Sequence, residues 1–191
     1  MAIAERTELE AAPAPRRISL DDFLALPEDG YKHEWVDGEV VFVPTKWLHD
    51  GIISRLHFLL YPLGAPLGAF ALGQAGCWMA SGNLRVPDLG FMRAERLPDG
   101  VAPNGFTDAG PDFCMEVISP SERRAGLERK REDYLASGTR ILWFVDPERG
   151  TVTVHAQGTP PRVLRDADAL ELADIIPGFH CTVADLLGTG E

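Results

Sequence analysis

Cysteine and positive charge are both scarce in this sequence, and each shortage excludes a class of protein. The three cysteines, Cys77, Cys114 and Cys181, are far apart and form no CxxC pair. A disulfide framework and a structural zinc site are therefore not expected, whereas a reducing cytoplasmic environment is. The formal net charge of −11 argues against a protein that coats nucleic acid or membranes by charge alone. It is compatible with a small local basic patch.

A long uncharged stretch is present, but it does not have the pattern of a membrane-spanning helix. Residues 56–84 contain no Asp, Glu, Lys or Arg, and this stretch is long enough to cross a bilayer. Two prolines and five glycines interrupt the stretch, so we expect a helix end, a turn and a core strand, and no membrane association. Residues 1–17 lack a signal-peptide pattern and predict a flexible arm. Residues 18–191 then have the length of a single domain.

The periodicity of apolar residues predicts several strands with intervening helices. A hairpin is indicated over residues 34–44, where Asp37-Gly38 is a favoured two-residue turn. Further strands are expected over residues 67–79, 84–91, 113–118, 141–145 and 151–155, and helices after Ser19 and over residues 47–61, 121–137 and 183–187. This alternation is typical of an α/β (α+β) fold in which a mixed β-sheet is flanked by helices.

Glu116 is the most informative single residue, because every other residue of the predicted strand 113–118 is apolar. A strand that is apolar on both faces is usually buried on both faces. Burial of an unpaired carboxylate costs several kcal/mol or shifts its pKa strongly. Glu116 therefore needs a lysine, an arginine or a metal ion beside it. The alternative is an edge strand that turns this side chain toward solvent.

Asp88 follows Pro87 inside a second apolar segment, residues 84–91. Proline favours an edge, a bulge or the start of a strand, and alone Asp88 would be explained as a turn-capping residue. If the two strands are neighbours, however, the carboxylates of Asp88 and Glu116 converge. Converging oxygens repel each other unless a hard cation such as Mg²⁺ lies between them.

Three further residues carry reactive side chains, and each has a structural alternative. Glu34 is a third candidate acid or a solvent-facing residue at a strand start. His49 either orients a water molecule or caps the helix that follows it. Cys114 lies on the same strand face as Glu116, but buried cysteines usually behave as small hydrophobic residues. Phosphate-loop, GxSxG and HExxH patterns are absent from the sequence, which excludes several common classes of hydrolase.

The predicted helix over residues 121–137 follows Glu116 directly and is rich in charge of both signs. Lys130 and Arg131 share its apolar stripe with Tyr134. Their charged ends either extend into water above packed aliphatic stems or reach the carboxylates. Periodicity alone leaves both alternatives open.

An ordered series of short motifs along the chain resembles a known family. It consists of Pro87-Asp88, Glu116-Val117-Ile118-Ser119-Pro120-Ser121, Lys130, Tyr134 and Trp143-Phe144-Val145-Asp146-Pro147, with Glu34, Asp37-Gly38 and His49 upstream. In this order the motifs are similar to those of the Uma-two family of restriction-endonuclease-like proteins, within the PD-(D/E)xK nuclease superfamily. The similarity spans about residues 18–187, which is nearly the whole chain.

The resemblance implies a restriction-endonuclease-like core and a Mg²⁺- or Mn²⁺-dependent endonuclease that hydrolyses DNA phosphodiester bonds. Asp88 and Glu116 would bind the metal, with the carbonyl of Val117 as a third ligand. The superfamily places its lysine two residues after the acid, where this chain has Ile118. Lys130 on the following helix would take over that role.

The resemblance also implies partners and leaves one alternative function open. Glu34 would complete the catalytic set, and DNA would be bound weakly and with strong salt dependence, because only a local patch can overcome the overall charge. Arg123, Arg124 and Arg129 are the expected patch. A homodimer is expected, because a duplex has two strands and symmetric pairs are common. The alternative is a catalytically silent nuclease-fold module for binding or assembly, which the net negative charge favours.

Overall fold

The structure, a computed structural model, describes residues 16–27, 29, 32–43, 46–120 and 122–190. Of the flexible arm predicted over residues 1–17, residues 1–15 lie outside this described part. The last two residues of that predicted arm instead form a short strand, β1 (Arg16–Arg17), which pairs with β3 (Glu39–Val43). The attachment continues beyond β1, because the Ile18 N–H donates to the Gly38 carbonyl.

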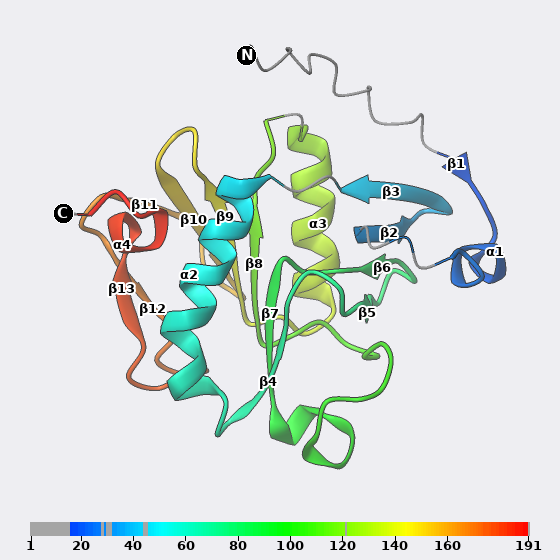
Figure 1. Ribbon diagram of the computed structural model, residues 1–191, viewed down its shortest axis with the longest axis horizontal. Coiled ribbons are helices and arrows are strands. Elements are labelled where there is room, and N and C mark those ends of the chain that lie inside the picture. Colours follow the sequence, from blue (N-terminus) through cyan, green and yellow to red (C-terminus); the bar gives the residue numbers. More distant parts are fainter. Residues whose placement is uncertain (1–15, 28, 30–31, 44–45, 121, 191) are drawn as a thin grey trace, which may run out of the picture.

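A six-stranded sheet forms the centre of the molecule (Figure 1). Its order is β11 (Arg162–Arg165), β10 (Thr151–Ala156), β9 (Ile141–Asp146), β8 (Phe113–Val117), β7 (Leu89–Arg93) and β4 (Gly68–Ala71). The β8–β9 pair is parallel, whereas the other neighbours in this sheet are antiparallel. The predicted mixed sheet is therefore confirmed, and β8, which carries Glu116, is an interior strand.

A five-stranded sheet, on the right in Figure 1, contains the predicted hairpin. Its order is β1, β3, β2 (Lys32–Val36), β6 (Leu84–Arg85) and β5 (Cys77–Trp78). Asp37 and Gly38 have φ values of 51° and 79°, the left-handed conformation that this two-residue turn requires. The remaining short elements are the paired strands β12 (Ala169–Glu171) and β13 (His180–Thr182) and the 3-10 helices η1 (Ala94–Arg96) and η2 (Pro98–Gly100).

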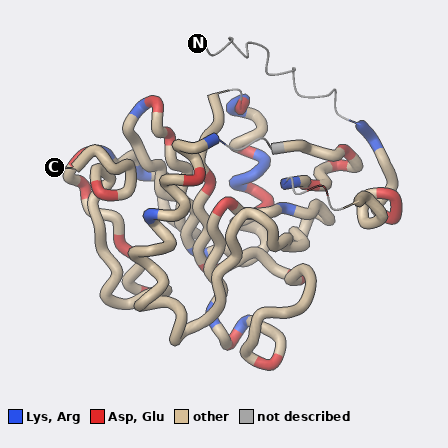
Figure 2. The backbone as a smooth tube through the Cα atoms, in the orientation of Figure 1, with Lys and Arg blue, Asp and Glu red and all other residues tan. Residues whose placement is uncertain are grey.

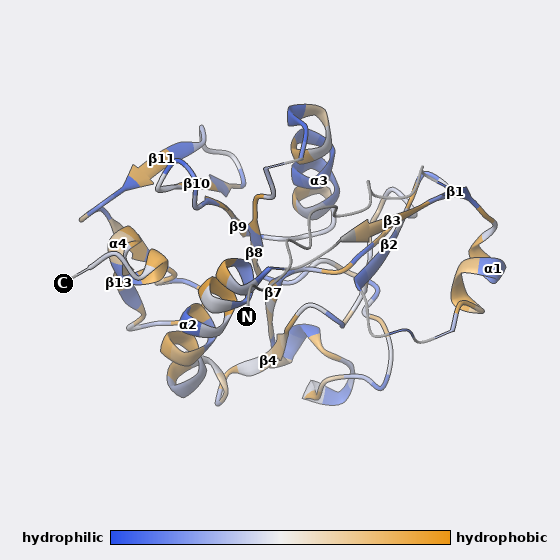
Figure 3. Cartoon of the chain, turned by 45° about the horizontal axis from the view of Figure 1, so that its top comes forward, coloured by the Kyte–Doolittle hydropathy of each residue, from blue (hydrophilic) through white to orange (hydrophobic). Residues whose placement is uncertain are grey.

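Two helices, α2 (Trp47–Gly64) and α3 (Arg124–Ala136), lie on opposite faces of the central strands (Figure 3). Side chains of a strand alternate between the two faces of its sheet. The odd-numbered residues of β8 pack in the apolar cluster that contains α2, whereas Cys114 packs with Tyr134 of α3. Glu116 shares the face of Cys114, so it points toward α3.

Two segments predicted as continuous strands are broken. Residues 67–79 form β4 and then β5 of the other sheet, and residues 84–91 form β6 and then β7. The second break includes Pro87, which lacks the N–H that a strand ladder requires. The chain passes from one sheet to the other at this point, and Asp88 lies at the junction.

The predicted helices are present, with some changes at their ends. Ser19 caps α1 (Leu20–Leu24) as expected, and α4 (Val183–Leu187) has its predicted bounds. α3 begins at Arg124, later than predicted, because Arg123 has an extended backbone with φ −89° and ψ 148°. Of the helices in the described ranges, none combines the length and the apolar character needed to cross a membrane.

Candidate active site

Asp88 and Glu116 come from adjacent strands and face each other. β7 and β8 are antiparallel with Leu89 opposite Met115, and the same register continued by one residue places Asp88 opposite Glu116. Both residues are buried, with 2% of each exposed. Like charges directly opposite each other destabilise an antiparallel pair, so the site depends on compensating cations. The alternative of an edge strand does not hold, because β8 lies between β7 and β9.

Each carboxylate directs one oxygen to a hydrogen-bond donor and the other to a shared cation. Asp88 Oδ2 accepts from the Val117 N–H at 2.8 Å, and Glu116 Oε1 accepts from the Tyr134 hydroxyl at 2.7 Å. The remaining oxygens, Asp88 Oδ1 and Glu116 Oε2, lie 2.7 and 3.8 Å from Nζ of Lys32. One ammonium group therefore contacts both carboxylates.

Lys32 is a site residue that the sequence analysis did not identify. It belongs to β2, in which alternate residues are buried, and it pairs with Asp88, 56 positions later in the chain. A pairing over that distance is a property of the fold and leaves no local pattern. The one signal in the sequence is the scarcity of lysine, since only three of the 18 basic residues are lysines. In the structure, two of these three contact Glu116.

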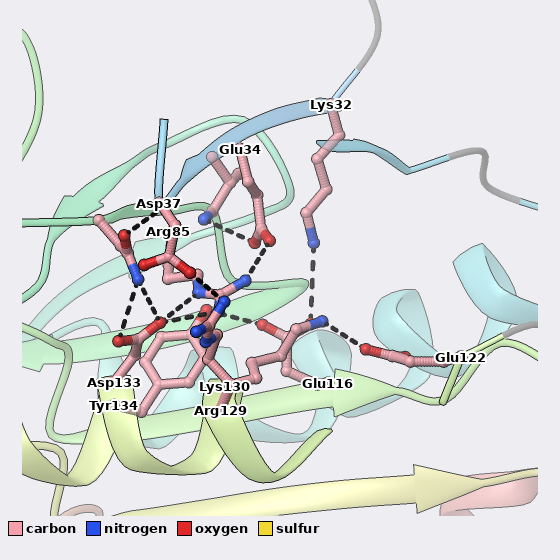
Figure 4. A network of polar contacts seen from close by, with 12 residues as sticks. Lys32, Glu34, Asp37, Arg85, Glu116, Glu122, Arg129, Lys130, Asp133 and Tyr134 are labelled. Atoms are coloured by element: carbon pink, nitrogen blue, oxygen red, sulfur yellow. Dashed lines mark hydrogen bonds and ion pairs between the residues drawn. The ribbon is translucent and has the colours of Figure 1, made fainter. Parts of the chain in front are cut away.

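Lys130 of α3 is the second lysine of the site (Figure 4). Its Nζ lies 3.2 Å from Glu116 Oε2 and 3.1 Å from Glu122 Oε1. Arg131, the next residue, pairs with Glu128 and keeps 29% of its side chain exposed. The two alternatives that periodicity left open therefore have different outcomes: Lys130 reaches the carboxylates, and Arg131 remains near the surface.

Glu34 is held by a buried arginine rather than exposed to solvent. Its Oε2 accepts from Nη1 of Arg85 at 2.9 Å, and its Oε1 accepts from the Val86 N–H at 3.1 Å. Arg85 also pairs with Asp133 of α3 through Nη2 at 2.7 Å. This chain of charges joins β2, β6 and α3 (Figure 4), and it fixes the helix that carries Lys130.

Ser81 and Asn83, both just before β6, extend the same network. Ser81 Oγ donates to Asp133 Oδ1 at 2.7 Å, and Asn83 Nδ2 donates to Asp133 Oδ2 at 3.1 Å. Asn83 Oδ1 accepts from the Asp37 N–H at 2.9 Å, and the Asp37 carboxylate pairs with Arg129. The hairpin turn and α3 are thus connected through a continuous set of polar contacts.

His49 lies near the start of α2 and contacts the carboxylate pair directly. Its Nε2 is 2.9 Å from Asp88 Oδ2, and its Nδ1 is 3.3 Å from Asp50 Oδ1. Burial lowers the pKa of His49, but the hydrogen bond and the charge of Asp88 raise it overall. The capping alternative does not hold, because Lys46 is the N-cap residue of α2.

The site holds three buried cations against four buried carboxylates. The cations are Lys32, Arg85 and Lys130, and the carboxylates are Glu34, Asp88, Glu116 and Asp133. Burial opposes the ionised form of Asp88, but Lys32 and His49 hold the pKa of this carboxyl well below its usual range. For Glu116, burial raises the pKa, and Lys130 and Lys32 offset only part of that effect. Fully ionised, these seven residues would carry one excess negative charge, and the raised pKa of Glu116 and of the adjacent His49 both act to reduce it.

The electrostatic surroundings of Lys130 keep it charged. Burial lowers the pKa of its ammonium group, but Glu116, Glu34 and Glu122 together raise it well above its usual value. At neutral pH the group is therefore a hydrogen-bond donor and a fixed positive charge. This differs from the behaviour of a lysine that acts as a proton acceptor, which needs a lowered pKa.

A cavity of about 360 Å³ opens beside the carboxylates. Its walls include Asp88, Glu116, Val117, His49 and Lys130. The volume lies within the range of small-molecule sites, and it brings these polar groups into contact with one space. A phosphate group that entered this space would meet the site residues directly.

The residues present fit a hard divalent cation. Asp88 Oδ1 and Glu116 Oε2 already face one positive group, the Lys32 ammonium, and carboxylate oxygens are the ligands that Mg²⁺ prefers. Within the part of the chain that the structure describes, no three His, Cys, Asp or Glu side chains are grouped as a metal cage. An ion would be held by two carboxylates, and Mg²⁺ commonly completes such a site with water and phosphate oxygens.

Cys114 is a packing residue of the α3 face. It is fully buried, and burial raises the pKa of its thiol well above the usual value. A thiolate nucleophile needs a lowered pKa, so Cys114 is unsuited to that role. All three cysteines are buried and unpaired.

The expected basic patch follows α3 (Figure 2). Arg123, Arg124 and Arg129 are exposed, although Arg129 pairs with Asp37. Acidic residues of the same helix alternate with these arginines in the sequence. The excess of positive charge is therefore local and small.

Comparisons with known proteins identify a family and a similar fold among solved structures. The sequence model of the Uma2 family, described as "Putative restriction endonuclease", matches residues 20–184. Among solved structures, the chain is similar to "a putative nuclease belonging to DUF820 from Anabaena variabilis ATCC 29413", with 24% sequence identity and a TM-score of 0.79. The match covers 90% of this chain and 98% of that chain, and it shows a shared fold. The search of curated proteins found no match.

Proposed function

The chain belongs to the Uma2 family of restriction-endonuclease-like proteins, and we propose that it is a divalent-metal-dependent endonuclease acting on DNA. One observation supports this proposal above the others: Asp88 Oδ1 and Glu116 Oε2, from adjacent strands, face a single cation. The proposed ion is Mg²⁺ or Mn²⁺. A symmetric homodimer, with one site for each strand of a duplex, is part of the proposal.

Asp88 and Glu116 would hold the metal, with the Val117 carbonyl as a third ligand. A bound Mg²⁺ supplies a Lewis acid that polarises a phosphate, lowers the pKa of a water molecule and neutralises developing charge. The chain itself fixes the two ligands, because the Val117 N–H holds one oxygen of Asp88 and the Tyr134 hydroxyl holds one oxygen of Glu116. Such fixed orientation supports catalysis because little reorganisation remains when the reaction takes place.

Lys130 would contribute a fixed positive charge, and Glu34 would position it indirectly. The Lys130 ammonium can hold the attacking water or the phosphate by hydrogen bonds, and the direction of its pKa shift favours this role over proton removal. Glu34 contacts Arg85, which in turn pairs with Asp133 on the helix of Lys130. We therefore assign Glu34 as a positioning residue of the catalytic set.

Replacement of Lys130 by methionine tests the role of that charge. Lys130→Met keeps the packed stem, and we expect the rate of DNA cleavage at saturating metal to fall by about 10²-fold, the usual scale for one lost electrostatic donor. Lys130→Arg should retain part of the rate if a cation is needed and lose it if a proton acceptor is needed, because arginine stays protonated. Rates are measured by nicking of supercoiled plasmid.

Arg131→Met is the matched control for Lys130→Met. Arg131 lies on the same helix and pairs at the surface with Glu128, so its loss should leave the cleavage rate near that of the wild type. Equal losses in Lys130→Met and Arg131→Met would show that Lys130 has no special part in the reaction.

DNA binding should be weak and steeply dependent on salt, because the net charge of −11 opposes it everywhere except at the patch. We expect the double substitution Arg123→Ala/Arg124→Ala to lower the affinity and to reduce the slope of log K against log salt by about two. Fluorescence anisotropy with a labelled duplex at several salt concentrations measures both. Arg149→Ala is the control, because Arg149 is also exposed and pairs with Asp146, the last residue of β9. A slope unchanged by the double substitution would place the DNA elsewhere.

A catalytically silent module is the second candidate, and Lys32 is the observation that favours it. Its ammonium contacts both carboxylates and balances part of their charge without any metal, as a purely structural ion pair would. Cleavage assays on plasmid, linear duplex and single-stranded DNA, with Mg²⁺, Mn²⁺ or a chelator, separate the two functions. Metal-dependent cleavage of any of these substrates supports the nuclease, and its absence from all of them supports the silent module.

A further inference from the structure

Among the described residues, Lys32 is the one whose ammonium contacts both carboxylates. It lies 2.7 Å from Asp88 Oδ1 and 3.8 Å from Glu116 Oε2, with 3% of its side chain exposed. The other oxygens of the pair accept from Val117 and Tyr134. An ion held jointly by Asp88 Oδ1 and Glu116 Oε2, the two oxygens that face Lys32, would compete with this ammonium for them.

Lys130 does not have this bridging position. Its ion pairs are with Glu116 and Glu122, so it can keep Glu122 as a partner when Glu116 turns to a metal. Among the described contacts, both ion pairs of Lys32 are with the carboxylate pair itself, Asp88 and Glu116. Lys32 therefore has no described ion-pair partner outside that pair. A divalent ion bound between Asp88 Oδ1 and Glu116 Oε2 would repel the Lys32 ammonium strongly at this short range in a buried site.

We propose that Lys32 is an internal counter-cation of the Asp88–Glu116 pair, which holds the metal-free site together and is displaced from it when a divalent ion binds. The inference rests on the proposed metal site. It adds Lys32, which is not part of the family motifs, to that site. Metal binding then involves an exchange of one cation for another. The affinity for the ion is lower than the two carboxylates alone would give, and the metal-free protein is stable because the carboxylates never lack a partner.

Mn²⁺ titration of Lys32→Met tests the exchange. Methionine keeps the apolar stem and removes the charge, so the dissociation constant for Mn²⁺ in calorimetry should fall by about tenfold or more relative to the wild type. In chelator the variant should melt at a lower temperature than the wild type, because two buried carboxylates lose a cation. Mn²⁺ should then raise its melting temperature by more than it raises that of the wild type.

Lys46→Met is the matched control, since Lys46 is the exposed N-cap residue of α2 and its side chain makes no capping hydrogen bond. Its Mn²⁺ affinity and melting temperature should equal those of the wild type. If Lys32→Met is unfolded in chelator, recovery of its circular dichroism on addition of Mn²⁺ supports the proposal. If it is unfolded in both conditions, Lys32→Gln, whose amide can still donate to Asp88, takes its place in the same titration.

The outcomes separate this inference from the proposed function. A wild type that binds neither Mn²⁺ nor Mg²⁺ contradicts the proposed metal site itself. A wild type that binds Mn²⁺, together with a folded Lys32 variant that binds it equally well or more weakly, overturns the counter-cation role and leaves the metal site standing.

Discussion

Asp88→Asn is expected to lose metal-dependent DNA cleavage by about 10³-fold or more, because a metal ion supplies several kcal/mol of transition-state stabilisation that this ligand controls. The substitution keeps the size of the side chain, and its amide oxygen can still accept from the Val117 N–H. Glu116→Gln should have the same effect. Plasmid nicking at saturating Mg²⁺ measures the loss, with the folded state checked by circular dichroism.

Asp112→Asn is the control for this substitution. Asp112 is as deeply buried, with 1% exposed, and it is ion-paired, in this case with Arg96. Its contacts lie outside the carboxylate pair, so its replacement should lower stability without lowering the metal-dependent rate of the folded protein. Persistence of cleavage in Asp88→Asn would mean that the activity does not come from this site.

The largest loss of stability is expected from Arg85→Met. Arg85 is 4% exposed and pairs with both Glu34 and Asp133, which are themselves buried. Removal of one partner from a buried ion network leaves uncompensated charge, which costs about 3–5 kcal/mol of the free energy of unfolding. Urea denaturation followed by tryptophan fluorescence measures this free energy.

Arg17→Met provides the comparison, because Arg17 pairs with Glu39 at the surface, with 78% of its side chain exposed. Exposed ion pairs contribute at most about 1 kcal/mol, so a small effect is expected there. If Arg85→Met lowered the free energy of unfolding by less than about 1 kcal/mol, the Glu34–Arg85–Asp133 network would not be what fixes α3 against the five-stranded sheet.

The two acids could be predicted from the sequence because burial makes a strong local pattern. A single carboxylate in an otherwise apolar strand needs a partner wherever the strand lies, so the sequence points to Glu116 whatever the topology of the sheet. The proximity of Asp88 was conditional on the strands being neighbours, and the antiparallel β7–β8 pairing meets that condition. The hairpin turn could also be predicted locally, because Asp37 and Gly38 both tolerate the left-handed backbone that it requires.

The partners of these acids could not be predicted, because they depend on contacts between distant segments. Lys32 reaches Asp88 across the junction between the two sheets, and Arg85 becomes the partner of Glu34 only when β6 lies beside β2. The break in residues 84–91 was missed for a related reason. Apolar composition does not show that a chain changes sheets, although Pro87 marked the place. Lys130 and Arg131 are consecutive residues of one helix and therefore point in different directions. The apolar pattern of the helix does not show which of the two faces the carboxylates.

Calorimetric titration of the wild type and Asp88→Asn with Mn²⁺ tests most directly whether the Asp88–Glu116 pair is a metal site. We expect one ion bound per chain of the wild type and of Asp112→Asn, and none bound by Asp88→Asn. Equal binding of Mn²⁺ by the wild type and Asp88→Asn, or no binding by the wild type, would contradict this expectation.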